Sequence, residues 1–175
     1  MKTVKYLCDN CNSLVSVKED IKECPNCSSK LFKRNLIKNK TKLRNIAWAK
    51  FSRYIRVRDC LKTTGNPDVG KCYTCGEEHE INKLQAGHMV DGRSYDVLFD
   101  ENFVNAQCYR CNMPKSGKQG LFVLKKIEEL QSNGKTLEES YSIVKSVFYK
   151  DSVEYTLDDI ANVYFEYKKK LDELT

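Results

Sequence analysis

The chain has 175 residues, with 30 basic and 24 acidic side chains and a formal net charge of +6. This length suits one ordinary domain, or two or three small domains stabilised by metal. It contains no run of eighteen apolar residues and its N-terminus has no apolar core, so we expect no membrane-spanning helix, no secretory signal and no membrane partner. We therefore expect a cytoplasmic protein.

Nine cysteines are the most informative feature of the composition. In the reducing cytoplasm, clustered cysteines are more often metal ligands than disulfides. Tetrahedral zinc takes four soft ligands, so two Cys-x-x-Cys pairs complete one site. Cys60 is left over, and we interpret it as a small buried side chain in a helix. The remaining eight predict two structural zinc ions, held by Cys8, Cys11, Cys24 and Cys27 and by Cys72, Cys75, Cys108 and Cys111.

Residues 1–34 are interpreted as a zinc ribbon. A short polar segment separates its two cysteine pairs, and Leu14, Val15 and Val17 within that segment favour a β-hairpin. So small a unit has little core and would depend on its metal to fold. Binding of nucleic acid or protein by this ribbon and simple bracing of a neighbouring domain are equally compatible with the sequence.

Residues 35–69 form a basic helical connector in this interpretation. From Ser28 to Lys71 there are thirteen basic side chains against two acidic ones, a local charge of +11. Trp48, Phe51 and Ile55 keep helical spacing, so the basic cluster of Lys50, Arg53, Arg56 and Arg58 belongs to an amphipathic helix. Such a helix suits a surface that follows DNA phosphates, although an ordinary solvated face is the alternative. The residues expected to contact DNA from this helix are Arg53, Arg56 and Arg58.

Residues 70–118 are expected to form the central zinc-stapled unit. Apolar residues predict a first strand that ends near His88, and a Gly- and Asp-rich loop follows it. A second strand then returns to the Cys108 pair, and a helix begins within a few residues of Asn112. Strand, loop, strand and helix around a metal are the ββα-metal arrangement, whose zinc-binding form is the treble clef. The predicted class is α+β, built from small zinc-stapled domains.

Residues 119–175 are predicted to be a helical tail that serves as core or as a dimerisation surface. Leu121, Leu124, Ile127 and Leu130 mark a first amphipathic helix that stops at Gly134. Thr136 with Glu139, and Thr156 with Asp159, offer capping boxes for two further helices.

The chain has only two histidines, and their contexts differ. His79 lies in a charged turn and is expected to be solvated. His88 ends a strand beside a glycine and a loop, inside the zinc-stapled unit. A hydrogen-bonded structural imidazole is one interpretation of His88. A zinc ligand is not expected, since four thiols already complete that site.

Several motifs together resemble a known family. They are Phe51–Asp59, a Cys-x-x-Cys pair, Leu84-Gln-Ala-Gly-His88, and Gln107-Cys-x-x-Cys-Asn112 with Ser116-Gly117. Over roughly residues 45–130, this combination resembles the phage lambda NinG (Rap) recombination proteins. His88, Asn102 and Asn112 also resemble the HNH nuclease motif in an H-N-N form, and the zinc knuckles resemble those of endonuclease VII-type resolvases. The resemblance implies a phage- or prophage-encoded endonuclease that cuts branched DNA such as Holliday junctions and D-loops.

The family resemblance also implies roles for individual residues. His88 matches the general base that activates water, and Asn112 matches a ligand of a catalytic Mg²⁺ or Mn²⁺ ion. Asn102 matches the residue that holds the histidine across the loop. Many HNH enzymes carry Asp or His as a second metal ligand just before the base, but this chain has Gly87 there. Asp91, Asp96 and Asp59 are the candidates left open for that second ligand.

Other residues are expected around the DNA backbone. Arg93 is placed to clamp the scissile phosphate, and Lys115 and Lys118 to hold neighbouring phosphates. Resolving a junction needs two cuts, so a homodimer is expected. We expect no small-molecule cofactor. Two alternatives stay open: an HNH nicking endonuclease without branch preference, and a non-catalytic double-zinc DNA-binding protein in which His88 is structural.

Overall fold

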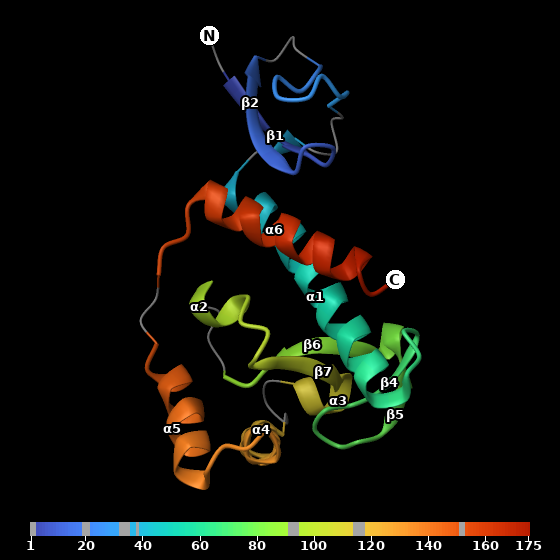
Figure 1. Ribbon diagram of the computed structural model, residues 1–175, viewed down its shortest axis with the longest axis vertical. Helices are drawn as coiled ribbons and strands as arrows, with labels where there is room; N and C mark the ends of the chain where they lie inside the picture. The colour runs from blue at the N-terminus through green and yellow to red at the C-terminus, as the bar shows by residue number, and fades with distance from the viewer. Residues whose placement is uncertain are drawn as a thin grey trace. The chain divides into compact units, whose positions relative to one another are not determined.

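The computed structural model describes residues 3–18, 22–31, 36–37, 39–90, 95–113, 118–150 and 153–175. It is a mixed α+β protein with two compact units (Figure 1). The first unit contains Met1–Phe51 and Tyr155–Glu173, and the second contains Ser52–Glu154 and Leu174–Thr175. These units divide the chain differently from the four segments expected from sequence, because the connector helix belongs to both units and the tail is split between them. Among the helices described, none has the length and apolar character needed to cross a membrane.

The N-terminal ribbon is a small antiparallel sheet. β1 (Thr3–Cys8) pairs with β2 (Ser13–Lys18), and β3 (Leu36–Ile37) pairs with the other edge of β1. The segment with Leu14, Val15 and Val17 was expected to form a hairpin by itself. It supplies only the second strand, β2, and the first strand, β1, lies before it on the other side of the Cys8–Cys11 knuckle. Val15 and Val17 pack with cysteine side chains in a core too small to be stable alone.

Two helices complete the first unit. α1 (Lys40–Thr64) is the predicted basic helix, and its residues up to Phe51 belong here. Phe51 is fully buried and meets Tyr167 of α6 (Leu157–Asp172) edge to face, with 4.7 Å between ring centroids. The Tyr164 hydroxyl of α6 also donates to Asp9 Oδ1 at 2.8 Å. The third tail helix therefore packs within the ribbon unit. Its predicted capping box at Thr156 is present.

The second unit is organised around two antiparallel hairpins. β4 (Val69–Lys71) pairs with β5 (Glu78–Glu80), and a 3-10 turn, η2 (Ile81–Lys83), leads into β6. β6 (Leu84–His88) pairs with β7 (Val104–Cys108), and His88 lies opposite Val104. The short helix α2 (Tyr95–Leu98) lies between these strands, and α3 (Tyr109–Asn112) follows β7 directly. The predicted order of strand, loop, strand and helix is thus present.

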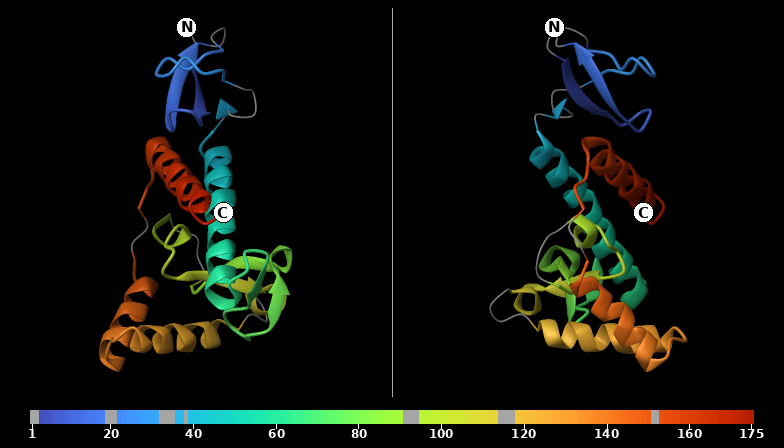
Figure 2. Two further views of the ribbon diagram at one scale, coloured as in Figure 1. Left: turned by 45° about the vertical axis from the view of Figure 1, so that its right-hand side comes forward. Right: turned by 90° about the vertical axis from the view of Figure 1, so that its left-hand side faces the viewer.

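Two further helices cover this unit, α4 (Gln119–Ser132) and α5 (Leu137–Phe148), which contact each other (Figure 2). The predicted capping box at Thr136 opens α5. Leu121 and Leu124 were expected on the buried stripe, but they are 46% and 56% exposed. Phe122 is buried instead, in a cluster with residues from the β6–β7 loop and from α5. The buried face of α4 is therefore rotated relative to the predicted one, and Phe122 fills the space beside Tyr73.

Candidate functional site

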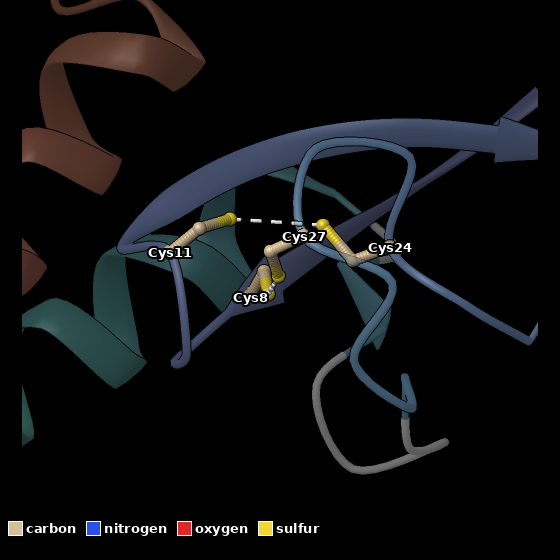
Figure 3. A group of neighbouring side chains, drawn as sticks. All are labelled: Cys8, Cys11, Cys24 and Cys27. Carbon is tan, nitrogen blue, oxygen red and sulfur yellow. Dashed lines mark hydrogen bonds between the residues drawn. The ribbon is translucent and has the colours of Figure 1, made fainter.

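The N-terminal cysteines form a four-thiol cluster that fits zinc (Figure 3). Their sulfur atoms lie within 4.8 Å of one another, and the Cys8–Cys27 and Cys11–Cys24 pairs are each 3.6 Å apart. Four sulfurs at a Zn–S distance of about 2.3 Å in a tetrahedron are about 3.8 Å apart. A hydrogen bond from Ser29 lowers the pKa of Cys27 to about 6, which favours the thiolate that zinc binds.

The second cluster contains Cys72, Cys75, Cys108 and Cys111, with all four sulfur atoms again within 4.8 Å. The Cys108 backbone N–H donates to Cys72 Sγ at 3.3 Å, so the backbone of one knuckle orients a thiol of the other. Burial raises the pKa of Cys111, so its ionisation needs the positive charge of a bound ion. The donor sets of both clusters fit the two predicted structural zinc ions.

The fourth knuckle differs from the other three in its backbone. Asn12, Ser28 and Gly76 directly follow the first three knuckles, and all have positive φ, of 48°, 58° and 75°. This left-handed conformation turns the chain back. Asn112 follows the fourth knuckle and lies in α3 instead. Beyond it, the Lys118 backbone N–H donates to the Cys111 carbonyl at 3.2 Å, which ties the start of α4 to the knuckle.

His88 ends β6, as predicted, and its imidazole reaches the β6–β7 loop. Nε2 lies 3.2 Å from the carbonyl oxygen of Leu98. A carbonyl can only accept a hydrogen bond, so Nε2 carries the proton in the neutral ring and Nδ1 carries the lone pair. The ring is thereby held in the tautomer in which Nδ1 can accept a proton.

Asn102 lies in an exposed turn before β7. Its Nδ2 and its backbone N–H both donate to Asp100 Oδ1, at 3.0 and 3.1 Å. Asp100 is also ion-paired with Lys150, which lies just beyond α5, at 2.9 Å. The amide nitrogen of Asn102 thus stabilises its own turn, and the carbonyl bonded to His88 comes from Leu98. The role of Asn102 in holding the histidine stays a prediction.

Asn112 and Gln107 converge on the residue before the histidine. Asn112 Nδ2 donates to Gln85 Oε1 at 2.8 Å, while Asn112 Oδ1 lies 2.7 Å from the place where a Cβ atom on Gly87 would be. Gln107 Oε1 lies 1.8 Å from the same place, so only glycine fits at residue 87 without displacing Gln107. The sequence motif contained Gln107, but nothing local indicates that its side chain crosses to the neighbouring strand.

Arg58 and the adjacent Asp59 fasten β7 to α1. The Arg58 guanidinium donates to Asp59 Oδ1 at 2.8 Å and to the carbonyls of Glu101 and Val104 at 2.9 and 3.0 Å. Asp59 is buried and accepts the Ala106 backbone N–H at 2.6 Å. This pair therefore positions the strand that carries Gln107. Contact of Arg58 with DNA stays a prediction.

The remaining predicted DNA contacts are spread along the chain. Arg53 is partly exposed on α1, and Arg56 donates to the carbonyls of Ser52 and Ile81, each at 3.2 Å. Lys118 is exposed at the start of α4. The predicted positions that lie outside the described residues are Asp91, Arg93 and Lys115, together with the side chain of Asp96.

His79 differs from its expected solvated state. It lies in β5, and only 26% of its side chain is exposed. Its Nε2 is 3.8 Å from Glu77 Oε2, too long for a hydrogen bond. The ring lies beside Glu77 and Cys75, and the ligand atoms of the three residues are within 4.8 Å of one another.

Glu129 joins three segments of the second unit, a feature that the sequence analysis missed. Its carboxylate accepts from Lys126 at 2.6 Å, from Lys62 of α1 at 2.7 Å and from the Tyr73 hydroxyl at 3.0 Å. Tyr73 stands within the Cys72–Cys75 knuckle. Burial alone would raise the pKa of Glu129. The hydrogen bonds from the two lysines outweigh this effect, and the pKa is lowered to about 2. This network fixes the zinc knuckle against α1 and α4.

Comparisons of the chain with protein-family models, with curated proteins and with solved structures found no match. The site residues themselves indicate what chemistry the protein can perform. Those residues combine a four-thiol scaffold, an imidazole with a defined tautomer, and two amide oxygens beside Gly87, the residue before the histidine. Thiolates hold soft zinc, whereas amide oxygens suit a hard divalent ion, so one unit offers donors for both.

Proposed function

We propose that the protein is a divalent-metal-dependent DNA endonuclease of the HNH type in which His88 activates the attacking water. One observation carries the proposal: Asn112 Oδ1 lies 2.7 Å from the Cβ position of the residue directly before His88. An oxygen donor that follows a zinc knuckle thus lies beside the residue that precedes the proposed base. In an HNH-type site the base takes the proton from water and the oxygen donor holds the divalent ion; here His88 ends β6 and Asn112 follows β7.

Each residue has a defined task in this proposal. His88 Nδ1 takes a proton from water as the water attacks phosphorus, while Leu98 keeps the proton on Nε2. Asn112 offers an oxygen ligand for Mg²⁺ or Mn²⁺, and the cysteines keep zinc. When bound, the divalent ion would stabilise charge on the scissile phosphate and on the leaving 3′ oxygen.

The charge distribution supports DNA as the substrate. The +11 segment from Ser28 to Lys71 includes α1, which carries Arg53 and Arg56 and leads directly into the zinc-stapled unit. Basic side chains that replace counterions on phosphates give affinity for DNA of any sequence. Preference for branched recombination intermediates, action as a homodimer and phosphate contacts by Arg93, Lys115 and Lys118 are proposed from the resemblance to the NinG family.

Cleavage of a labelled four-way junction tests the proposal. Purified zinc-loaded protein is incubated with the junction, or with a linear duplex of the same arm sequence, with and without added Mg²⁺ or Mn²⁺. We expect metal-dependent cuts in the junction, with slower cutting of the duplex. His88→Ala should bind the junction without cutting it, and His79→Ala, which removes the only other histidine, should still cut.

Two results would favour the alternatives. Equal rates on junction and duplex would indicate a nicking endonuclease without branch preference. Binding of the junction by wild-type protein, with no cleavage in either metal, would indicate a non-catalytic DNA-binding protein and would overturn the nuclease assignment.

A further inference from the structure

We propose that Gln107 supplies the second protein ligand of the catalytic divalent ion, in place of the side chain that residue 87 lacks. This inference rests on the proposed nuclease function and deepens it. Gln107 Oε1 occupies the position of a Cβ atom on Gly87, within 1.8 Å, and Asn112 Oδ1 lies 2.7 Å from that same point. Two amide oxygens therefore meet where one side chain would stand.

The orientation of each amide is fixed by its nitrogen. Gln107 Nε2 donates to Thr74 Oγ1 at 2.5 Å, and Asn112 Nδ2 donates to Gln85 Oε1 at 2.8 Å. Each nitrogen is thereby turned toward an acceptor, and the two oxygens are turned toward Gly87. Gln107 is 2% exposed, so its side chain has little freedom to turn elsewhere.

Both oxygens carry partial negative charge and face one point, at 1.8 and 2.7 Å from it, so they repel each other. A cation between the oxygens would relieve this repulsion. Mg²⁺ and Mn²⁺ accept amide oxygens and require neighbouring ligands in an octahedral shell, most of which is water or phosphate. A pair of neutral oxygens fits this demand, and phosphate oxygens of the substrate would add negative charge.

Of the three carboxylate candidates, one has other partners in the structure, and Asp91 and the side chain of Asp96 lie outside the described residues. Asp59, one candidate from the sequence, accepts hydrogen bonds from Arg58, the Ala106 backbone and Asn105, and these hold it against β7. Gln107 is instead linked to the zinc scaffold, because Thr74 lies inside the Cys72–Cys75 knuckle. The Cys72–Cys75 knuckle, which would hold the structural zinc, thus positions Gln107.

Mn²⁺ binding measured by electron paramagnetic resonance tests this inference apart from catalysis. The His88→Ala protein is used in full length and zinc-loaded, bound to the four-way junction, so that no cleavage occurs. Mn²⁺ bound by the complex is compared with Mn²⁺ bound by the junction alone. We expect one additional Mn²⁺ per chain, and its affinity should fall at least about tenfold in Gln107→Met, which keeps the side-chain length but has no oxygen.

Three further variants keep the test decisive. Gln107→Glu offers an oxygen at the same place and should retain Mn²⁺ binding or tighten it, while Gln131→Met, an exposed glutamine change on α4, should leave it unchanged. Gly87→Asp in a Gln107→Ala background lacks the Gln107 oxygen that blocks residue 87, and only the side chain of Asn112, whose Oδ1 lies 2.7 Å from the Cβ position, must still shift. It should regain the Mn²⁺ affinity that Gln107→Ala loses.

The possible failures are distinguishable. If wild-type protein cuts the junction but Gln107→Met binds Mn²⁺ as tightly as its parent, Gln107 is not a ligand and the nuclease function stands. If the parent complex binds no additional Mn²⁺ and wild-type protein cuts no DNA, both proposals are wrong. Normal zinc content and an unchanged melting temperature of Gln107→Met establish that a loss of Mn²⁺ affinity is local.

Discussion

The two cysteine clusters have the same ligand set and the same knuckle spacing, yet their surroundings differ. In the ribbon, serine hydroxyls contact the thiols, with Ser13 at 2.9 Å from Cys11 Sγ and Ser29 at 3.1 Å from Cys27 Sγ. In the second unit, the knuckles lie beside a polar face of the β6–β7 hairpin, where Gln107 and Asn112 meet. Both units therefore share a four-cysteine scaffold that fits zinc. They differ in the polar side chains that the scaffold holds in place.

The backbone after each knuckle accounts for part of this difference. Positive φ at Asn12, Ser28 and Gly76 turns the chain away from three knuckles. The fourth continues as α3, which brings Asn112 back over the hairpin that precedes it. We infer that the two clusters should respond differently when each loses one ligand.

Loss of a cysteine ligand should have the largest effect. Cys72→Ser removes a buried ligand of the second cluster, and because structural zinc contributes on the order of 10 kcal/mol to small domains, we expect the second unit to unfold and cleavage to disappear. Cys24→Ser, the matched change in the ribbon, should lose one zinc and keep near-normal single-turnover cleavage at saturating protein. Zinc content and junction cleavage are the measurements. Abolished cleavage in Cys24→Ser, with the second zinc retained, would make the ribbon part of the catalytic machinery.

Charge reversal on α1 should have the next largest effect, on DNA affinity alone. Arg53→Glu with Arg56→Glu should weaken binding to junction and duplex alike and should reduce the slope of log affinity against log salt by about two. Lys135→Glu with Lys169→Glu, at exposed positions between α4 and α5 and on α6, is the matched control. Arg56 also hydrogen-bonds the Ile81 carbonyl, so Arg53→Glu alone, with a slope change of about one, separates binding from folding. An unchanged slope would show that α1 is not the DNA surface.

Substitution of one carboxylate in each unit, Glu129 or Asp9, compares how much each contributes to the stability of its unit. Glu129→Gln leaves Lys126, which is 5% exposed, without its charged partner, so we expect a loss of about 3 kcal/mol in unfolding free energy of the second unit. Asp9→Asn in the ribbon unit affects a 43% exposed side chain bonded to Tyr164 and should cost at most about 1 kcal/mol. Urea unfolding measures both. Equal losses would mean that the Glu129 network does not brace the knuckle.

The smallest expected effect is a pH dependence of the same network. The pKa of Glu129 is lowered from its ordinary value of 4.5 to about 2, so its ionised form stabilises the folded state. That contribution is complete above pH 4.5 and is lost as the pH falls toward 2. The unfolding free energy of wild-type protein should therefore drop more than that of Glu129→Gln across this interval. Parallel curves for the two proteins would show that Glu129 does not supply this stability.

Much of the fold follows from signals that lie within a few residues of one another. Cysteine spacing indicated both four-thiol clusters, and the apolar pattern before His88 placed the end of β6 correctly. The Thr136 and Thr156 capping boxes marked the starts of α5 and α6 because the two partners are three residues apart. Cys60 is fully buried against Gly70, as a leftover apolar cysteine should be.

The features that sequence did not reveal depend on contacts between distant segments. The placement of Gln107 over Gly87 requires the β6–β7 register, in which Gly87 pairs with Asn105. The assignment of α6 to the ribbon unit depends on Phe51 meeting Tyr167. A missing side chain at Gly87 looked like a lost ligand in the sequence, whereas the structure shows that its space is filled by another strand's amide.

The most direct test of the central claim is chemical rescue of His88→Ala on the four-way junction. Removing a general base should lower the single-turnover cleavage rate about 10² to 10⁴-fold in Mg²⁺ without weakening DNA binding. Added imidazole should restore part of that rate in His88→Ala, and it should leave wild-type protein and His79→Ala unchanged. Cleavage by His88→Ala at the wild-type rate, with or without imidazole, would contradict the assignment of His88 as the base.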